Sequence, residues 1–517
     1  MAGTGSRPRA AAVRSRASRS LAELRGAASS RAVWLGFTGS LLILIGSLSP
    51  AYLPQASPMW DVLRGLGIDG PTTKWVGTGA TLVGLLALLE AWFRLRPAAR
   101  RARGRQELRT WPVLGIISAP LLFGPPIFSH DAYSYAAHGW LMENHLSPYQ
   151  VGPGTLPGYF ADQVAWVWRE TTAPYGPLAL WQSHVLDGLV NFDPFLSAML
   201  MRVPALFGVV LIGLCVPRIA RRVGVDPAAA SWFAVLNPIL VIDFIGGAHN
   251  DSQMTGLMLL GILITMRYRA WWGGALVVGV AAAVKQPAFL VAVALPFLVT
   301  PWTSWKPRPT AIAAAKALAS LGLAVAVFAG ISVASGLGFG WINAINVPGM
   351  VDTVSPFTVV GHVVQFPVNL ITGDPDGRAV VALFKGIGSV FAVLGIAWFA
   401  VKHLGRRPLH FVSYSFIWFA LCAPAIHSWY LLWGAVLLPM TKPSTRALRA
   451  AIVVTVFLLG FNAMNFGLRN GMWLMVFVLF GVSYWIVHTH ELSQPMEKPD
   501  SIPAERGPAV PDAPKHA

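Results

Sequence analysis

Long apolar stretches, separated by short polar segments, recur along almost the whole chain. They lie at 33–54, 74–96, 111–129, 195–217, 228–245, 252–268, 271–284, 287–300, 312–335, 379–401, 408–423, 428–440, 447–466 and 471–488. Because about 20 helical residues cross the hydrocarbon core of a bilayer, we predict an all-α, polytopic membrane protein with about 12–14 transmembrane helices.

Composition supports a membrane protein and argues against a nucleic-acid-binding one. The 517 residues are 55% hydrophobic and 12% charged, with a formal net charge of +17. The basic residues lie in short segments between apolar stretches, where they set the orientation in the membrane. We therefore expect membrane lipids, and no nucleic acid, as partners. Cys215 and Cys422 both lie inside apolar stretches, which supports neither a disulfide framework nor a zinc site.

Arginines predict which side of the membrane each loop faces. Arg7–Arg31 and Arg94–Arg109 flank the first two apolar stretches and favour the cytoplasm. The third stretch then runs outward and brings Asp131 to the outer face. With alternating spans, the long loops 130–194 and 336–378 are also external. The predicted topology has both termini in the cytoplasm.

The domain organisation follows from the same pattern. Residues 1–32 are predicted to be a basic disordered tail, residues 33–490 the transmembrane domain, and residues 491–517 a second disordered tail. Within the first outer loop, Pro177–Val190 is helical in pattern and is predicted to lie at the interface. Residues 271–300 form either one kinked helix or a hairpin; we favour a hairpin that turns at Lys285–Gln286–Pro287.

A carboxylate at the rim of an apolar stretch is the first candidate for chemistry. In the segment FSHDAYSYAAHG, Asp131 stands among Tyr133, Tyr135 and His138. If this segment is helical, Asp131, Tyr135 and His138 share one face. Such a carboxylate can accept a proton from a hydroxyl nucleophile, and the rings beside it can hold a sugar. The alternative is an interfacial aromatic belt around one acidic residue.

Two further polar groups are expected on the same outer face. The turn TAPYGP presents Tyr175 to a ligand or anchors it at the interface. In GGAHND, the side chains of His249, Asn250 and Asp251 have the chemistry to bind sugar hydroxyls. Asp251 is equally suited to cap the helix that follows it. A divalent cation held with Asp131 is a third, less favoured interpretation.

Cationic groups predict that the ligand carries a phosphate. Lys285 interrupts an apolar segment, where an ammonium is costly unless it is paired. A phosphate would pair with it, and an internal carboxylate such as Asp243 or Asp251 is the alternative. Two more cations are predicted at the outer ends of spans, and two aromatic side chains there are either sugar ligands or interfacial anchors. These four residues are His427, Arg469, Trp429 and Tyr430.

The order of several motifs carries a family resemblance. FSHDAYSYAAHG, SPYQVGP, TAPYGP, LNPILVID, GGAHND and AVKQP follow one another along the chain. Together they resemble the actinobacterial polyprenyl-phosphomannose-dependent α-(1→6)-mannopyranosyltransferases, which are GT-C class integral-membrane glycosyltransferases. The resemblance covers residues 33–490. It implies that the catalytic base is an acidic residue in the first long outer loop, a position that Asp131 matches.

The resemblance also implies substrates and a location. The donor would be polyprenyl-phosphate mannose and the acceptor a lipid-anchored mannan, extended on the outer face of the plasma membrane towards lipomannan and lipoarabinomannan. Early and late elongation enzymes are not distinguished. No cofactor is expected, and a metal is not favoured.

The resulting hypothesis is an inverting single displacement. Asp131 accepts the proton of the acceptor hydroxyl, while Lys285, helped by His427 or Arg469, stabilises the departing phosphate. The alternatives are a related transferase that moves arabinose from decaprenyl phosphate, and a flippase or transporter of a lipid-linked saccharide. A polymer-binding scaffold is a third interpretation, which gives no reason to bury Lys285. The oligomeric state stays open.

Overall fold

The computed structural model describes residues 7–344, 351, 353–374, 377–468 and 473–493. Within these ranges every regular element is helical and none is a strand, which confirms the all-α prediction. The α-helices are α1 (Arg7–Ala28), α2 (Arg31–Ser47), α3 (Met59–Gly65), α4 (Pro71–Arg94), α5 (Pro97–Ala102), α6 (Thr110–Leu122), α7 (Asp131–Glu143), α8 (Tyr159–Gln163), α9 (Pro177–Leu189), α10 (Pro194–Leu200), α11 (Arg202–Arg222), α12 (Pro227–Ala234), α13 (Asp251–Tyr268), α14 (Trp271–Val284), α15 (Phe289–Ala294), α16 (Pro307–Ala334), α17 (Pro356–Thr372), α18 (Ala379–Phe399), α19 (Pro408–Cys422), α20 (Ser428–Ala435), α21 (Thr445–Leu468) and α22 (Trp473–Ser493).

Several of these helices are long and apolar enough to cross a membrane. Among the described residues there are five, or six if the bent pair Ser18–Ala28 and Arg31–Ser47 is one span; the five are Pro71–Arg94, Pro194–Arg222, Pro307–Ala334, Ala379–Leu404 and Thr445–Gly467. Five more apolar helices are shorter, at 10–17 residues. The predicted run 228–245 is broken into α12 and the π-helix Leu240–Gly246, because Pro238 cannot continue a regular helix. The chain is a multi-pass membrane protein.

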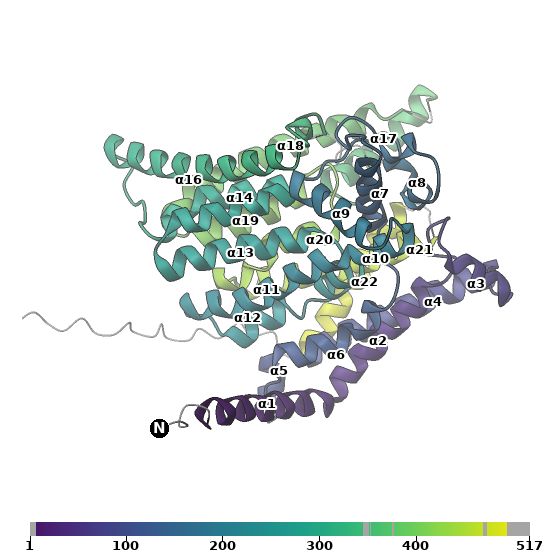
Figure 1. Cartoon of the computed structure of the whole chain (residues 1–517), viewed down its shortest axis with the longest axis horizontal. Helices are drawn as coiled ribbons and strands as arrows, with labels where there is room; N and C mark the ends of the chain where they lie inside the picture. The colour runs from purple at the N-terminus through teal and green to yellow at the C-terminus, as the bar shows by residue number, and fades with distance from the viewer. Residues whose placement is uncertain (1–6, 345–350, 352, 375–376, 469–472, 494–517) are drawn as a thin grey trace, which may run out of the picture.

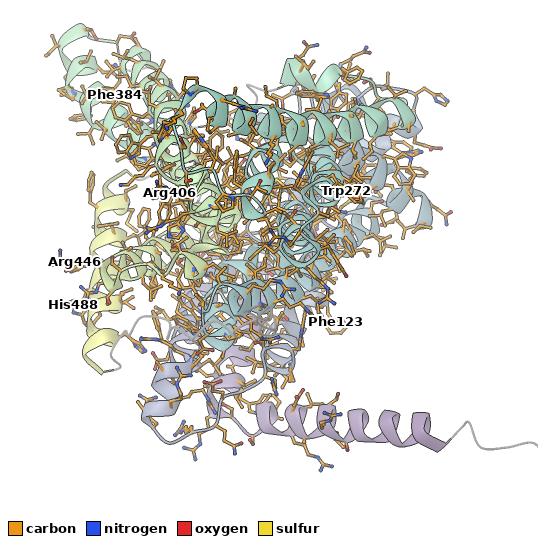
Figure 2. All side chains as sticks on the ribbon, turned by 90° about the vertical axis from the view of Figure 1, so that its left-hand side faces the viewer. Phe123, Trp272, Phe384, Arg406, Arg446 and His488 are labelled. Carbon is orange, nitrogen blue, oxygen red and sulfur yellow. The ribbon has the colours of Figure 1, made fainter. Side chains whose placement is uncertain are left out.

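The helices pack as a bundle with an arm along one side (Figure 1). In this arm α2 and α4 lie side by side, and α1 continues from α2 at a bend of 74°. At the opposite edge, only a small minority of the side chains of α16 and α18 are buried. Large apolar side chains also lie on the outside, among them Phe123 and Trp272 (Figure 2), whose exposed fractions are 82% and 57%. A lipid environment accounts for such a surface.

The hairpin predicted at Lys285 is present. Helix α14 ends at Val284, Lys285 is extended (φ −155°, ψ 125°), and the chain resumes in a 3₁₀ turn, Gln286–Ala288, before α15. A Cβ built on Gly274, near the start of α14, would lie 3.2 Å from Leu295 Cδ1, just after α15. The chain therefore returns alongside α14 instead of continuing as one kinked helix.

Other parts of the predicted organisation turned out differently. Helix α1 occupies Arg7–Ala28, where a disordered tail was expected, because alanine and arginine are strong helix formers. The expected outer loop 336–378 contains α17, which packs on α18. In contrast, the helix predicted at Pro177–Val190 is present: it corresponds to α9, which packs on α7. Of the tail predicted at 491–517, residues 491–493 complete α22 and the rest lies outside the described residues.

Candidate active site

One large cavity, with a volume of about 940 Å³, brings together the acid and the lysine that the sequence singled out. Its walls come from the start of α7, the segment before α9, the α14–α15 turn and the segment before α20. Its principal polar and aromatic lining residues are His130, Asp131, Ser134, His138, Arg169, Tyr175, Lys285, Gln286, His427, Trp429, Tyr430 and Trp433.

Asp131 is the carboxylate that reaches this cavity from the first turn of α7. Its side chain is 18% exposed, which leaves it accessible to a ligand. Tyr135 Oη donates to Oδ2 over 3.5 Å, so the predicted i, i+4 relation on one helical face is confirmed. The position at a helix N-terminus also favours a negative charge. This carboxylate is placed to remain ionised and to accept a proton.

His249 lies behind Asp131. Its Nδ1 is 3.4 Å from Asp131 Oδ2, and its side chain is fully buried. The imidazole of His249 stacks on the ring of Trp429, with 3.7 Å between the ring centres. The imidazole of His427 also stacks on Trp429, at 4.5 Å. His249 does not line the cavity. The structure thus places this predicted sugar ligand as a support for the carboxylate.

Electrostatics at Asp131 depend on this arrangement. Burial would raise the pKa of Asp131, but the His249 imidazole, with smaller contributions from His427 and Lys285, outweighs burial and holds the pKa well below its usual range. Burial lowers the pKa of His427 to about 4. At neutral pH His427 therefore offers a phosphate an N–H hydrogen bond in place of the positive charge that was predicted.

Lys285 has an internal partner. Its Nζ lies 2.8 and 3.0 Å from the two carboxylate oxygens of Asp251, and Trp433 Nε1 donates to the same carboxylate over 2.8 Å. Asp251 is completely buried, so it is the counter-ion of Lys285, which was the stated alternative, and not a sugar ligand. The ammonium also lies 4.9 Å from the ring centre of Tyr430.

This pairing does not remove Lys285 from the cavity. The residue is 7% exposed and belongs to the cavity wall. An ammonium has three N–H donors, of which Asp251 uses two. The third can bind an anionic group of the substrate. Because Asp251 holds Lys285 in place, the ammonium is preorganised.

The remaining predicted residues divide into two groups. His138, Tyr175, Trp429 and Tyr430 lie on the cavity wall, as expected of sugar or acceptor ligands. Tyr133 and Asn250 are buried away from it, and the Tyr133 hydroxyl donates to the Pro126 carbonyl over 3.4 Å. These two residues were predicted as ligands, but neither lines the cavity. Arg469 lies outside the described residues.

Arg169 is a cavity residue that the sequence interpretation missed. It follows the 3₁₀ turn Trp166–Trp168, and both tryptophans of this turn also line the cavity. Its Nη2 donates to the Asp162 carbonyl over 3.0 Å, and its Nη1 lies 3.5 Å from Asp162 Oδ1, so Asp162 holds the guanidinium in place. The signal was the sequence WVWRE, in which aromatic residues precede a cation, a combination suited to a phosphorylated sugar.

Gly176 fixes the TAPYGP turn against the end of α14. Its N–H donates to the Val284 carbonyl over 3.0 Å, and a Cβ at this position would lie 2.2 Å from the Ala283 carbonyl oxygen. Tyr149 Oη donates to the Tyr175 carbonyl over 2.9 Å. Only glycine allows this close approach, which sets Tyr175 beside Lys285.

Replacing Gly176 by alanine should therefore displace Tyr175 from the cavity wall. We expect up to roughly 10²-fold slower turnover, because misplacement by an ångström has effects of that size. The matched control is Gly322→Ala in α16, where an added Cβ meets nothing within 4 Å. Initial rates in membranes containing equal amounts of each variant test this. Equal rates for the two variants would contradict the role of the turn.

Comparison with known protein families decides the class. Residues 33–304 match the family model described as "Alpha-(1->6)-mannopyranosyltransferase, N-terminal domain". The chain belongs to this family. Residues 357–489 match a second model, described as "MptB C-terminal domain". The family membership inferred from the motifs is thereby confirmed, and the protein is a glycosyltransferase.

Curated relatives of the α-(1→6)-mannopyranosyltransferase family extend over most of the chain. Alpha-(1→6)-mannopyranosyltransferase A of Mycobacterium tuberculosis is 32% identical over 438 residues, covering 81% of each protein. The enzyme of the same name from Corynebacterium glutamicum is 29% identical over 446 residues, covering 81% of this chain and 89% of its own. Alpha-(1→6)-mannopyranosyltransferase B of that organism is 27% identical, with coverages of 78% and 72%. These names support mannosyltransferase activity for this protein.

Proposed function

We propose that the protein transfers mannose from a polyprenyl-phosphate mannose donor to a hydroxyl of a lipid-anchored mannan, extending an α-(1→6)-linked backbone of the lipomannan type. The observation that carries this proposal is the common cavity of Asp131 and Lys285, which joins a proton acceptor to a cation. Relatives named as α-(1→6)-mannopyranosyltransferases support the sugar and the linkage.

The proposed reaction is a single inverting displacement. The acceptor hydroxyl oxygen forms a bond to the anomeric carbon while its proton passes to the carboxylate of Asp131. The bond between the anomeric carbon and the phosphate oxygen breaks, and the polyprenyl phosphate leaves with the electron pair. The third N–H of Lys285, the imidazole of His427 and the guanidinium of Arg169 stabilise the negative charge of the phosphate. This step requires no cofactor.

The aromatic cavity walls suit both halves of such a donor. Rings of Trp166, Trp168, Tyr175, Trp429 and Trp433 line the cavity, and aromatic faces stack on sugars and pack against polyprenyl chains. Arg218, Arg221 and Arg222 lie at the C-terminal end of α11, whereas Ala205 near its other end accepts a hydrogen bond from Ser252, the neighbour of Asp251. By the positive-inside rule this end of α11 favours the cytoplasm, which supports an extracytoplasmic active site and cytoplasmic termini.

A direct assay separates the proposed enzyme from its rivals. Membranes containing the protein are incubated with synthetic polyprenyl-phosphomannose and a short α-(1→6)-mannoside, and the product is analysed for length and linkage. We expect a mannoside one residue longer. Transfer only from decaprenyl-phosphoarabinose would identify the related arabinosyltransferase, and translocation of unmodified lipid would identify a flippase.

The contact between His249 and Asp131 predicts a change in pH dependence. A general base works when deprotonated, so the lowered pKa of Asp131 should keep wild-type transfer active in mildly acidic buffer. His249→Phe keeps a ring against Trp429 but removes the nitrogen that faces Asp131. Only the smaller contributions of His427 and Lys285 then oppose burial, so the pKa of Asp131 should rise and the acidic limb of the rate profile should move to higher pH.

The measurement is the ratio of transfer rates at pH 5 and pH 7. We expect this ratio to fall in His249→Phe. Tyr133→Phe is the control, because it removes a hydroxyl on the same helix that contacts the Pro126 carbonyl and not Asp131. If His249→Phe lowers both rates by the same factor, His249 only contributes to packing.

A further inference from the structure

A second cavity, of about 560 Å³, lies between the C-terminal ends of α11 and α13. These two helices pack side by side in the bundle (Figure 1). Four arginines share the cavity with an apolar floor and one tyrosine. The lining residues are Arg218, Arg221, Arg222, Leu260, Leu263, Ile264, Arg267 and Tyr268.

This cavity is separate from the active site. Helix α13 begins at Asp251, which pairs with Lys285 beside the catalytic cavity, and ends at Tyr268, which lines the arginine cavity. At 1.5 Å per residue the two ends are roughly 25 Å apart. A ligand in the arginine cavity therefore cannot touch the groups that carry out transfer.

The arginines leave their positive charge available. None of the four forms an ion pair with a carboxylate among the described residues. Arg218 donates to the Leu214 carbonyl of its own helix, and the Arg267 guanidinium lies 5.3 Å from the ring centre of Tyr268. The C-terminal ends of two helices contribute partial negative charge, but this is much less than four full positive charges. The cavity thus favours an anion, and guanidinium groups match phosphate geometry in particular.

An apolar track leads from this cavity along α11. The exposed side chains of this helix recur at intervals of three or four residues, so they share one face and reach the cavity at Arg218. The track consists of Val203, Phe207, Val210 and Leu214, which are 37–52% exposed. Because α11 is part of the apolar span Pro194–Arg222, this face can hold an acyl chain within the membrane.

We propose that this cavity binds the phosphate of an anionic phospholipid, whose acyl chain lies along the α11 track. A phosphodiester carries the charge that the four arginines require, and the apolar floor excludes a fully hydrated ion. The continuity of the track with the cavity distinguishes a lipid from a soluble anion. Clusters of arginines between membrane helices are known to favour anionic headgroups.

The test uses the full-length protein in phosphatidylcholine nanodiscs that contain increasing fractions of phosphatidylglycerol. Lipids retained after extraction into detergent are counted by native mass spectrometry. The double variant Arg221→Gln/Arg222→Gln should bind phosphatidylglycerol roughly 25-fold more weakly, at about fivefold per arginine. The matched control is Arg308→Gln/Arg446→Gln, which removes two exposed arginines that do not line this cavity. The control should retain phosphatidylglycerol within twofold of the wild type.

Two further measurements keep the proposal open to refutation. If the double variant does not fold, as judged by size-exclusion chromatography, the single variant Arg221→Gln replaces it, with about a fivefold loss expected. Phe207→Ser on the track should weaken retention of phosphatidylglycerol, whereas inorganic phosphate should compete poorly. Equal retention by Arg221→Gln/Arg222→Gln and the control would overturn the site. Competition by inorganic phosphate at equal concentration, with no effect of Phe207→Ser, would overturn the lipid assignment.

Discussion

Asp131→Asn should slow mannosyl transfer by about 10²–10⁴-fold, the usual effect of removing a general base. Asparagine has almost the same shape and can still contact Tyr135 and His249, but its amide cannot accept the proton of the acceptor hydroxyl. The protein should therefore fold normally. Single-turnover rates with saturating donor and acceptor provide the measurement.

Donor binding separates a chemical defect from a structural one. Because Asp131 is proposed to act on the acceptor, Asp131→Asn should bind polyprenyl-phosphomannose with nearly wild-type affinity. Asp69→Asn, at an exposed position before α4, is the control and should have a normal rate. Wild-type turnover by Asp131→Asn would remove Asp131 from the mechanism and leave the cavity without its base.

The sequence was a good guide wherever local patterning determines structure. Apolar runs located the helices, and proline beside Lys285 located the hairpin turn. The amphipathic helix α17 was missed because its polar face, the internal Pro367 and the following Gly373 resemble a loop. The run 228–245 was predicted as continuous, since hydropathy does not register the interruption at Pro238.

The site was harder to predict because it depends on how separate helices rotate against one another. The polar residues that meet at the active-site cavity were visible in the sequence as clusters at the ends of apolar runs. Whether Lys285 faces Asp243, Asp251 or a substrate depends on the rotation of α13 against α14, which no local pattern encodes. Arg169 was missed because it lies in an irregular segment without periodicity. His249 and Asp131 are adjacent only through tertiary packing.

The Lys285–Asp251 pair should dominate the stability of the site. Asp251 is fully buried and Lys285 nearly so, and removing one partner of a buried pair destabilises by about 3–5 kcal/mol because the other charge is left uncompensated. Asp251→Leu and Lys285→Met should each lower the free energy of unfolding by that amount. The double variant Lys285→Met/Asp251→Leu should recover most of the loss. Arg64→Met is the control, because its pair with Asp61 is exposed and contributes little.

The same four proteins decide whether Lys285 also binds the donor phosphate. If the lysine only balances the charge of Asp251, the double variant regains transfer activity together with stability. If its third N–H binds the phosphate, the double variant is stable but transfers mannose slowly and binds the donor more weakly. We expect the second result, because Lys285 lines the cavity and Asp251 does not. Recovery of both activity and donor affinity in the stable double variant would assign phosphate binding to His427 and Arg169 alone.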